Sequence, residues 1–219
     1  MRTPEEGIRD LQEFKAAGFK GAMLPGEPGV ADYDDEIYDP FYEAAVDLDM
    51  PLSFHILTSG KDSLSAPRGN RLNAWNAIIR GCQDIMGLFV FGGVFERHPK
   101  LKVVCVEADA GWVPHFLYRM DHGYNRHRHW MQGKELSRLP SEYFKENIYL
   151  TFQDDWTAFK VAHLCNVERL MWANDFPHSD STWPWSQELL AEHTADMSVH
   201  DRDRILHDNC AELYGLKLQ

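Results

Sequence analysis

Hydrophobic and polar positions follow two different periods along the chain. Short, unbroken apolar runs are typical of strands buried on both faces of a parallel sheet. These runs cover residues 19–25, 52–57, 101–109, 147–152 and 169–175. Between them, apolar residues recur every three or four positions, as they do along one face of a helix. The predicted helices cover residues 3–18, 39–48, 73–97, 114–131, 155–165, 184–195 and 199–213. Strands that alternate with helices predict an α/β fold with a parallel sheet.

Two local signals refine these boundaries. The segment Thr3-Pro4-Glu5-Glu6 combines an N-cap threonine, a proline at the first helical position and a capping-box glutamate, so a helix is expected to begin there. The long helical region 73–97 is expected to break near Gly87 or at Gly92 and Gly93, since glycine interrupts helices.

Carboxylate, amide and imidazole side chains gather at the carboxyl ends of four predicted strands. They are His55, Glu107, Asp109, Gln153, Asp154, Asp155, Asp175 and His178. In parallel α/β folds these strand ends meet at one edge, where ligands and catalytic groups are placed. Imidazole and carboxylate groups that converge on one point suit a divalent ion such as Zn²⁺ or Mn²⁺. The pattern therefore predicts a metal or acid–base site at this edge.

Each of these residues also has a purely structural interpretation. His55 fits a hydrogen-bonded core histidine, and Asp175 fits a helix or loop cap. Glu107 and Asp109 fit the first turn of the next helix, where its dipole favours acids. Three nearby tryptophans are expected to pack in the core rather than to line a substrate: Trp112, Trp183 and Trp185. Only the placement of these residues together, at the ends of successive strands, favours a metal or acid–base site over these structural roles.

Composition narrows the class of protein. With 219 residues, 44% of them hydrophobic, the chain is predicted to form one globular domain. A formal net charge of −12 argues against nucleic acid or an anionic membrane as a partner, and the basic run 126–129 is interpreted as a solvated helix end. No apolar stretch reaches about 18 residues and no signal peptide is visible, which predicts a cytoplasmic protein. The cysteines form no CxxC pair and are expected to be reduced: Cys82, Cys105, Cys165 and Cys210.

Four segments resemble the amidohydrolase-related family, which includes aminocarboxymuconate semialdehyde decarboxylase and related metal-dependent hydrolases and decarboxylases. They are LSFHI (52–56), FERHPKLKVVCVEADAGWVPHFLYRMD (95–121), ERLMWANDFPHSDSTWP (168–184) and DNCAELYG (208–215). The resemblance implies a (β/α)8 TIM barrel with a metal at the carboxyl-end mouth. It implies that His55 is the metal-binding histidine of the fifth barrel strand. It also implies that Asp175 is the eighth-strand aspartate that contacts the metal and the activated water.

The chain departs from this family pattern in two ways. Glu107 stands near the position where many relatives have a catalytic histidine on the sixth strand. The HxH or ExH pair of the first strand is absent. If residues 52–57 are the fifth strand, the first three βα units are missing, since a complete barrel typically needs about 250 residues. Residues 1–219 are therefore interpreted as one N-terminally truncated barrel domain with strands four to eight.

The predicted function is a metal-dependent hydrolase that acts on a small, carboxylate-bearing substrate, with Zn²⁺ as the expected ion and Mn²⁺ as the alternative. Asp175 would carry the proton, while His178 or Glu107 would orient the substrate or assist as acid or base. A non-oxidative decarboxylase remains an open alternative, as does an inactive or binding module completed by a partner chain. Exposed sheet edges predict a homo-oligomer. A loop with Lys61, Arg68 and Arg71 fits either an acidic substrate or plain solvent.

Overall fold

The computed structural model describes residues 1–58 and 69–217 and contains one sheet of five parallel strands. The strands are β1 (Ala22–Leu24), β2 (Leu52–His55), β3 (Val103–Val106), β4 (Ile148–Phe152) and β5 (Leu170–Trp172). Each strand pairs with the next along the chain, in the order β1-β2-β3-β4-β5. The α/β prediction is confirmed. All five strands lie within the predicted ranges but are shorter, because residues at one or both ends of each range belong to loops or to helical segments.

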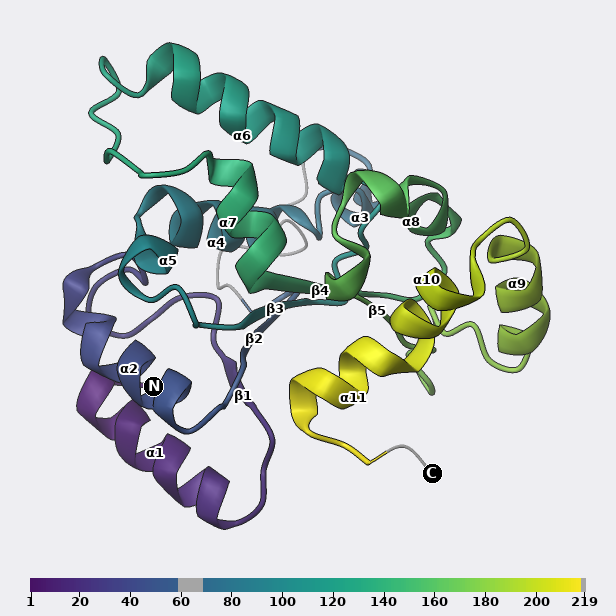
Figure 1. The fold of residues 1–219 in the computed structure, drawn as a ribbon, viewed down its shortest axis with the longest axis horizontal. Coiled ribbons are helices and arrows are strands. Elements are labelled where there is room, and N and C mark those ends of the chain that lie inside the picture. Colours follow the sequence, from purple (N-terminus) through teal and green to yellow (C-terminus); the bar gives the residue numbers. More distant parts are fainter. Residues whose placement is uncertain (59–68, 218–219) are drawn as a thin grey trace.

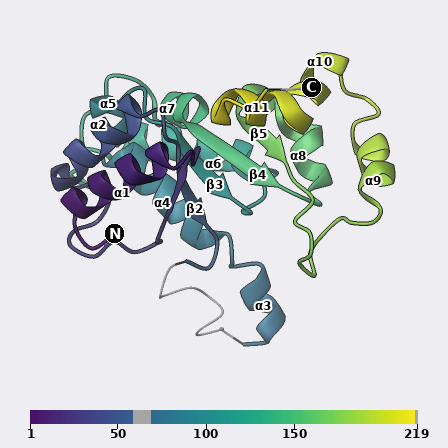
Figure 2. The same ribbon diagram turned by 90° about the horizontal axis from the view of Figure 1, so that it is seen from below.

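Helices connect the strands and cover the sheet (Figure 1). The α-helices are α1 (Pro4–Ala16), α2 (Asp39–Asp47), α3 (Arg71–Trp75), α4 (Arg80–Phe91), α5 (Val94–Arg97), α6 (Val113–His127), α7 (Pro140–Asn147), α8 (Trp156–Val161), α9 (Ser186–His193), α10 (Val199–Asp203) and α11 (Asn209–Tyr214). Short helical turns are η1 (Glu36–Tyr38), η2 (Ala162–Leu164), η3 (Val167–Arg169) and the π-helical η4 (Arg204–Asp208). Figure 2 shows α3 and α9 projecting from the body of the molecule.

The structure confirms most of the predicted helix boundaries. Thr3 caps α1, since its hydroxyl accepts a hydrogen bond from the Glu6 N–H at 3.2 Å. The region 73–97 does break at Gly92 and Gly93, where Gly93 has a φ of 71°, and it breaks a second time between α3 and α4. Gly87 lies inside α4 without interrupting it.

Helix α7 was missed, although the sequence carries a signal for it. Pro140 is its first residue, and the Glu142 side chain accepts the Leu139 N–H at 2.8 Å. This is the same combination of proline and glutamate that marks α1. The helix has only eight residues, too few for a clear apolar period.

The main core lies between the sheet and its helical layer. Alternate strand residues, such as Leu52 and Phe54 on β2, point into this core and are fully buried. The Phe54 ring packs edge-on against Tyr33 at 5.1 Å and against Phe89 of α4 at 5.4 Å between ring centroids. Continuous aromatic packing of this kind fixes β2 on α4 and so places the residues at the end of β2.

The other face of the sheet is covered in part by α11, which lies below the sheet in Figure 1. Leu213 of α11 forms a second buried cluster with Val104 of β3 and Met171 of β5. At the outer strand β1, by contrast, Met23 remains 65% exposed. Helix α11 therefore shields the part of this face that β3 and β5 form.

The structure confirms the expectations for the cysteines and for the basic run 126–129. Cys82, Cys105 and Cys165 are buried, Cys210 is half-buried, and all four are free thiols. The basic run 126–129 begins in the last turn of α6 and is largely exposed. Among the described residues, every helix is too short or too polar to cross a bilayer.

Candidate active site

The turn after β3 carries two carboxylates on an unusual backbone. Glu107 and Asp109 have φ values of 58° and 55°, in the left-handed region that most L-residues avoid. The Glu107 N–H donates to the Thr151 hydroxyl on β4 at 2.8 Å. Left-handed non-glycine residues cost roughly 1–3 kcal/mol each and cluster at active sites. Both side chains line the cavity beside the turn.

Asp155 fixes this turn from the neighbouring loop. One of its carboxylate oxygens accepts the N–H groups of Ala110 at 2.9 Å and Gly111 at 2.7 Å. The other oxygen caps α8 by accepting the Ala158 N–H at 3.0 Å. A side chain at Gly111 would collide with Asp155 and Thr157, so the close approach requires glycine. Asp155 therefore serves the fold and is not available as a metal ligand.

The loop after β5 supplies the second half of the site. Asp175 also has a left-handed φ, of 56°. The His178 Nδ1 lies 3.0 Å from the Asp175 Oδ2, and the His178 N–H donates to the Asp175 carbonyl at 2.9 Å. The loop is closed by Asn174, whose carbonyl accepts the Ser181 hydroxyl at 2.6 Å and the Thr182 N–H at 3.1 Å.

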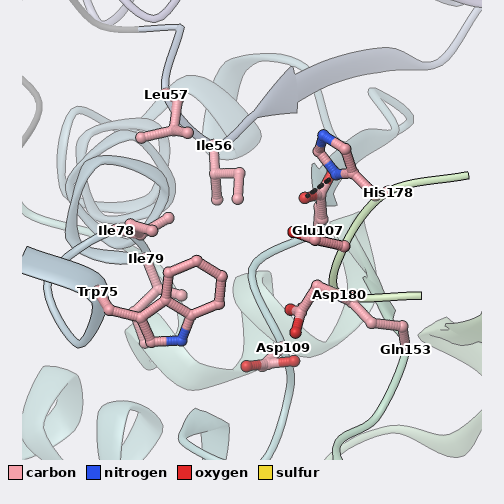
Figure 3. Close-up of a pocket in the computed structure, with 11 residues that line it drawn as sticks. Ile56, Leu57, Trp75, Ile78, Ile79, Glu107, Asp109, Gln153, His178 and Asp180 are labelled. Atoms are coloured by element: carbon pink, nitrogen blue, oxygen red, sulfur yellow. Dashed lines mark hydrogen bonds and ion pairs between the residues drawn. The ribbon is translucent and has the colours of Figure 1, made fainter. Parts of the chain in front are cut away.

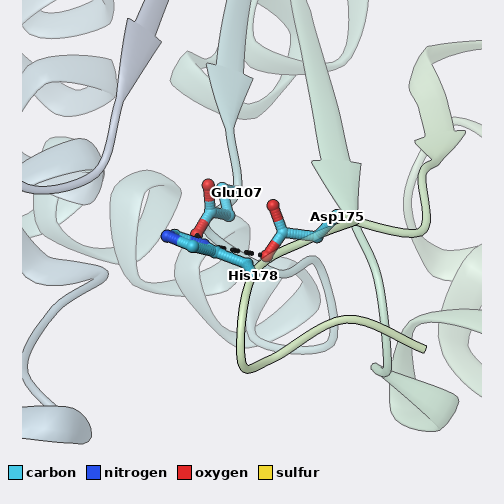
Figure 4. A group of neighbouring side chains, drawn as sticks. All are labelled: Glu107, Asp175 and His178. Carbon is cyan, nitrogen blue, oxygen red and sulfur yellow. Dashed lines mark hydrogen bonds and ion pairs between the residues drawn. The ribbon is translucent and has the colours of Figure 1, made fainter. Parts of the chain in front are cut away.

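These two loops bring Glu107, Asp175 and His178 together, as Figure 4 shows. One ligand atom from each residue lies within 4.8 Å of the others. His55 at the end of β2 joins the group, since its Nε2 is 2.7 Å from the Glu107 Oε2. The His55 Nδ1 is 2.6 Å from the Ile56 carbonyl, which favours the Nδ1–H tautomer. Two carboxylates and an imidazole form a donor set that fits a divalent cation.

A cavity of about 240 Å³ opens beside this cluster. Glu107, Asp109, His178 and Asp180 lie on its polar side, and the Gln153 amide donates to Asp180 at 3.1 Å. The opposite side is apolar and consists of Ile56, Leu57, Trp75, Ile78 and Ile79 (Figure 3). The cavity can therefore hold a flat, apolar molecule that presents a polar group to the cluster.

Within the cavity wall, burial, together with the nearby Asp155 and Asp180 carboxylates, raises the pKa of Asp109 to about 6. An ordinary aspartate in an unfolded chain has a pKa of about 3.9. The folded protein thus favours the protonated form of Asp109. This stabilising contribution is complete below about pH 4 and is lost as the pH rises through about 6.

The variant Asp109→Asn is expected to remove this pH dependence, and asparagine tolerates the left-handed backbone. At pH 8 the variant should be more stable than the wild type by roughly 1–2 kcal/mol, after allowance for solvent screening. Near pH 4 the two proteins should be equally stable. Urea unfolding in metal-free buffer at both pH values measures the difference, and an equal difference at both would contradict the assignment.

The sequence pointed to most of these residues but not to all. His55, Glu107, Asp175 and His178 do come together, with the closest three-ligand group formed by Glu107, Asp175 and His178 rather than by His55 with Asp175. Asp180 was missed, although it stands two residues after His178.

The expectation that the tryptophans pack in the core holds for Trp112, whose indole N–H donates to the Ala108 carbonyl at 2.7 Å. It is wrong for the other two, which are 57% and 65% exposed: Trp183 and Trp185. Lys61 and Arg68 lie outside the described residues.

The cluster of Glu107, Asp175 and His178 lies at the carboxyl ends of parallel strands, the edge at which α/β folds place ligands and catalytic groups. Residues 1–216 match the family model Amidohydrolase (Amidohydro_2), and the chain belongs to this family. A curated relative, "Decarboxylase orsB" from Emericella nidulans, is 25% identical over an alignment of 220 positions that covers 92% of this chain and 63% of the relative. The chain spans less than two thirds of the length of this relative.

Solved structures show the same fold. The 5-carboxyvanillate decarboxylase LigW from Sphingomonas paucimobilis has a TM-score of 0.82 at 20% identity, over 98% of this chain and 65% of LigW. The dihydroxybenzoic acid decarboxylase from Polaromonas sp. JS666, with bound manganese and the inhibitor 2-nitroresorcinol, has a TM-score of 0.72 at 22% identity, over 100% of this chain and 68% of that protein. The five strands are thus part of a (β/α)8 TIM-barrel type of fold, and the expectation of an incomplete barrel is confirmed.

Proposed function

We propose that this chain carries the site of a metal-dependent decarboxylase that removes a carboxyl group, as CO2, from a small aromatic acid. The observation that carries the proposal is the meeting of Glu107, Asp175 and His178 beside a cavity with an apolar far wall. Three similar proteins described above are decarboxylases, which favours this alternative over hydrolysis.

Glu107, Asp175 and His178 would hold the divalent cation. His55 is a proposed further donor, because its Nε2 already faces the Glu107 carboxylate. When bound, the cation polarises substrate oxygens and offsets the negative charge that develops on the substrate. Mn²⁺ and Zn²⁺ both accept such donors. The manganese in the Polaromonas enzyme supports Mn²⁺ as the first ion to test.

The side chains of this chain account for the remaining steps. The bond between the ring and the carboxyl carbon breaks, CO2 leaves, and a proton takes its place on the ring carbon. Asp175 delivers this proton, and His178, 3.0 Å away and 65% exposed, returns one to Asp175 from solvent. The apolar wall formed by Ile56, Ile78 and Ile79 packs against the ring and orients it.

A direct assay tests the proposal. Purified protein with Mn²⁺ or Zn²⁺ is incubated with carboxyl-labelled 5-carboxyvanillate or a dihydroxybenzoate, and labelled CO2 is counted. We expect metal-dependent release that a chelator abolishes and that His178→Gln lowers by about 10²-fold or more. The matched control His129→Gln, on an exposed histidine outside the site, should retain activity. Ester or amide hydrolysis without CO2 release would establish the hydrolase instead.

A second candidate, a barrel completed by a partner chain, is favoured by one observation. The outer edges of β1 and β5 have no strand partner within the described part of the chain. Unpaired edges favour association with another chain. In this view residues 1–219 are one domain that lacks the first three βα units, and a homo-oligomer forms at those edges. Sedimentation of the assayed sample decides between the candidates, because an active monomer would exclude the need for a partner.

A further inference from the structure

A second cavity, of about 350 Å³, lies at the end of α6 remote from the candidate active site. Helix α6 begins just after the turn that carries Glu107 and Asp109 and runs for 15 residues, a length of about 22 Å. The cavity is bounded by the end of α4, the last turns of α6 and the segment 128–134. It is larger than the cavity of about 240 Å³ at the candidate active site.

The walls of this cavity are mainly apolar. Phe91, Tyr124 and Met131 line it. The Met131 side chain is 63% exposed. Main-chain hydrogen bonds shape the segment that closes it. The Met131 N–H donates to the His127 carbonyl at 3.0 Å, and the Gly133 N–H donates to the Arg128 carbonyl at 2.8 Å. The hollow is therefore built into the local fold.

Two cations stand at this cavity. The Lys134 ammonium donates to the Gly92 carbonyl at 2.9 Å and has no ion-pair partner among the described residues. The Arg128 guanidinium lies over the Tyr124 ring at 4.9 Å, and its Nε is buried without a hydrogen-bond partner. This Nε lies 3.5 Å from the Glu135 carboxylate, the one ion-pair partner of Arg128 among the described residues. Two positive charges against one negative charge make this spot locally cationic on a chain of net charge −12.

We propose that this cavity binds a small organic anion with an apolar body, an alkyl or aryl monocarboxylate. The apolar walls would bury the body of the ligand, and Arg128 and Lys134 would receive its carboxylate. A polyphosphate or nucleic acid does not fit, because the walls are mostly apolar and carry only two cations. The proposal also gives a role to Arg128, which belongs to the basic run 126–129.

Calorimetric titration of the purified protein with octanoate tests this site, with octanol as a probe of equal chain length but no charge. We expect saturable binding of one octanoate and at least about 10-fold weaker binding of octanol. The double variant Arg128→Gln/Lys134→Gln should weaken octanoate binding by about 10-fold or more. Arg126→Gln, on an exposed member of the same basic run, should leave it unchanged.

A steric variant locates the binding. An added Cβ at Gly123, which lines the cavity, would meet no atom within 4 Å, so this position accepts a side chain and Gly123→Leu is expected to occupy part of the hollow. Leucine is also a better helix former than glycine. The variant should keep its thermal unfolding curve and lose octanoate binding by about 10-fold or more. Asp175→Asn should bind octanoate like the wild type, which separates this cavity from the candidate active site.

The proposal is overturned if the folded protein shows no saturable octanoate binding. It also fails if Gly123→Leu binds octanoate as tightly as the wild type, or if octanol binds equally well. A dimer that Gly123→Leu dissociates would show that a second copy covers the cavity instead. The double variant keeps the test decisive if Gly123→Leu does not fold.

Discussion

Replacement of Asp175 by asparagine is expected to remove both the bound cation and the metal-dependent activity. Asp175 contributes one of the three ligand atoms that lie within 4.8 Å of one another, and it is the proposed proton donor. Loss of a group that merely supports a ligand costs about 10–100-fold in metal affinity, so loss of a ligand should cost at least about 100-fold. Asparagine tolerates the φ of 56°, so the backbone should hold.

Elemental analysis and Mn²⁺ titration measure this effect directly. The wild type should hold close to one ion per chain, and Asp175→Asn close to none. His55→Ala should also weaken binding, by at least about 10-fold, because its Nε2 beside Glu107 is the proposed further donor. The control Asp47→Asn, on the exposed side of α2, should bind like the wild type. Near-stoichiometric metal in Asp175→Asn would show that other residues hold the ion.

The second large effect concerns stability. Phe54→Ala is expected to lower the free energy of unfolding by about 3–5 kcal/mol, because it leaves a cavity among fully buried rings. Phe54 is 0% exposed and contacts Tyr33 and Phe89, whose ring centroids lie 5.1 and 5.4 Å away. Since His55 follows directly on β2, metal affinity should fall as well. Urea unfolding measures the loss.

Met23→Ala is the matched control for this prediction. Met23 lies on β1, where its neighbour Leu24 pairs with Phe54, but its side chain is 65% exposed. Its truncation should change the free energy of unfolding by less than about 0.5 kcal/mol. A loss below about 1 kcal/mol in Phe54→Ala would show that the core between β2 and α4 closes up around the missing ring.

The sequence could predict which strand ends carry chemistry, because parallel strands share one carboxyl edge. Glu107 directly follows an apolar run, Asp175 follows one after the single residue Asn174, and His178 comes three residues after Asp175. Sequence reasoning could not separate Asp109 from Asp155. Both are acids just beyond a strand, yet Asp109 lines the cavity while Asp155 accepts three backbone N–H groups. Only the tertiary arrangement distinguishes them.

The sequence could not predict which apolar residues line the cavity at the candidate active site either. Trp75, Ile78 and Ile79 have the spacing of any core-facing helix, and nothing local indicates that they border a cavity. Helix α11 poses the same problem, since its apolar period predicts a helix but not which face of the sheet it covers. For Trp183 and Trp185 the sequence was misleading in the other direction. Their size predicts burial in the core, but both lie on the surface.

Hydrogen bonds from side chains outside the ligand cluster hold the loops around the site together. Thr151 holds the Glu107 backbone, Asp155 holds the turn after it, and Gln153 reaches Asp180 in the loop after β5. All three linking residues come from β4 and the segment that follows it. Such a rim is preorganised, so the entropy of ordering the ligands is lost during folding and not again when the ion binds. Differences in affinity between cations should then reflect ion size and ligand preference rather than loop ordering.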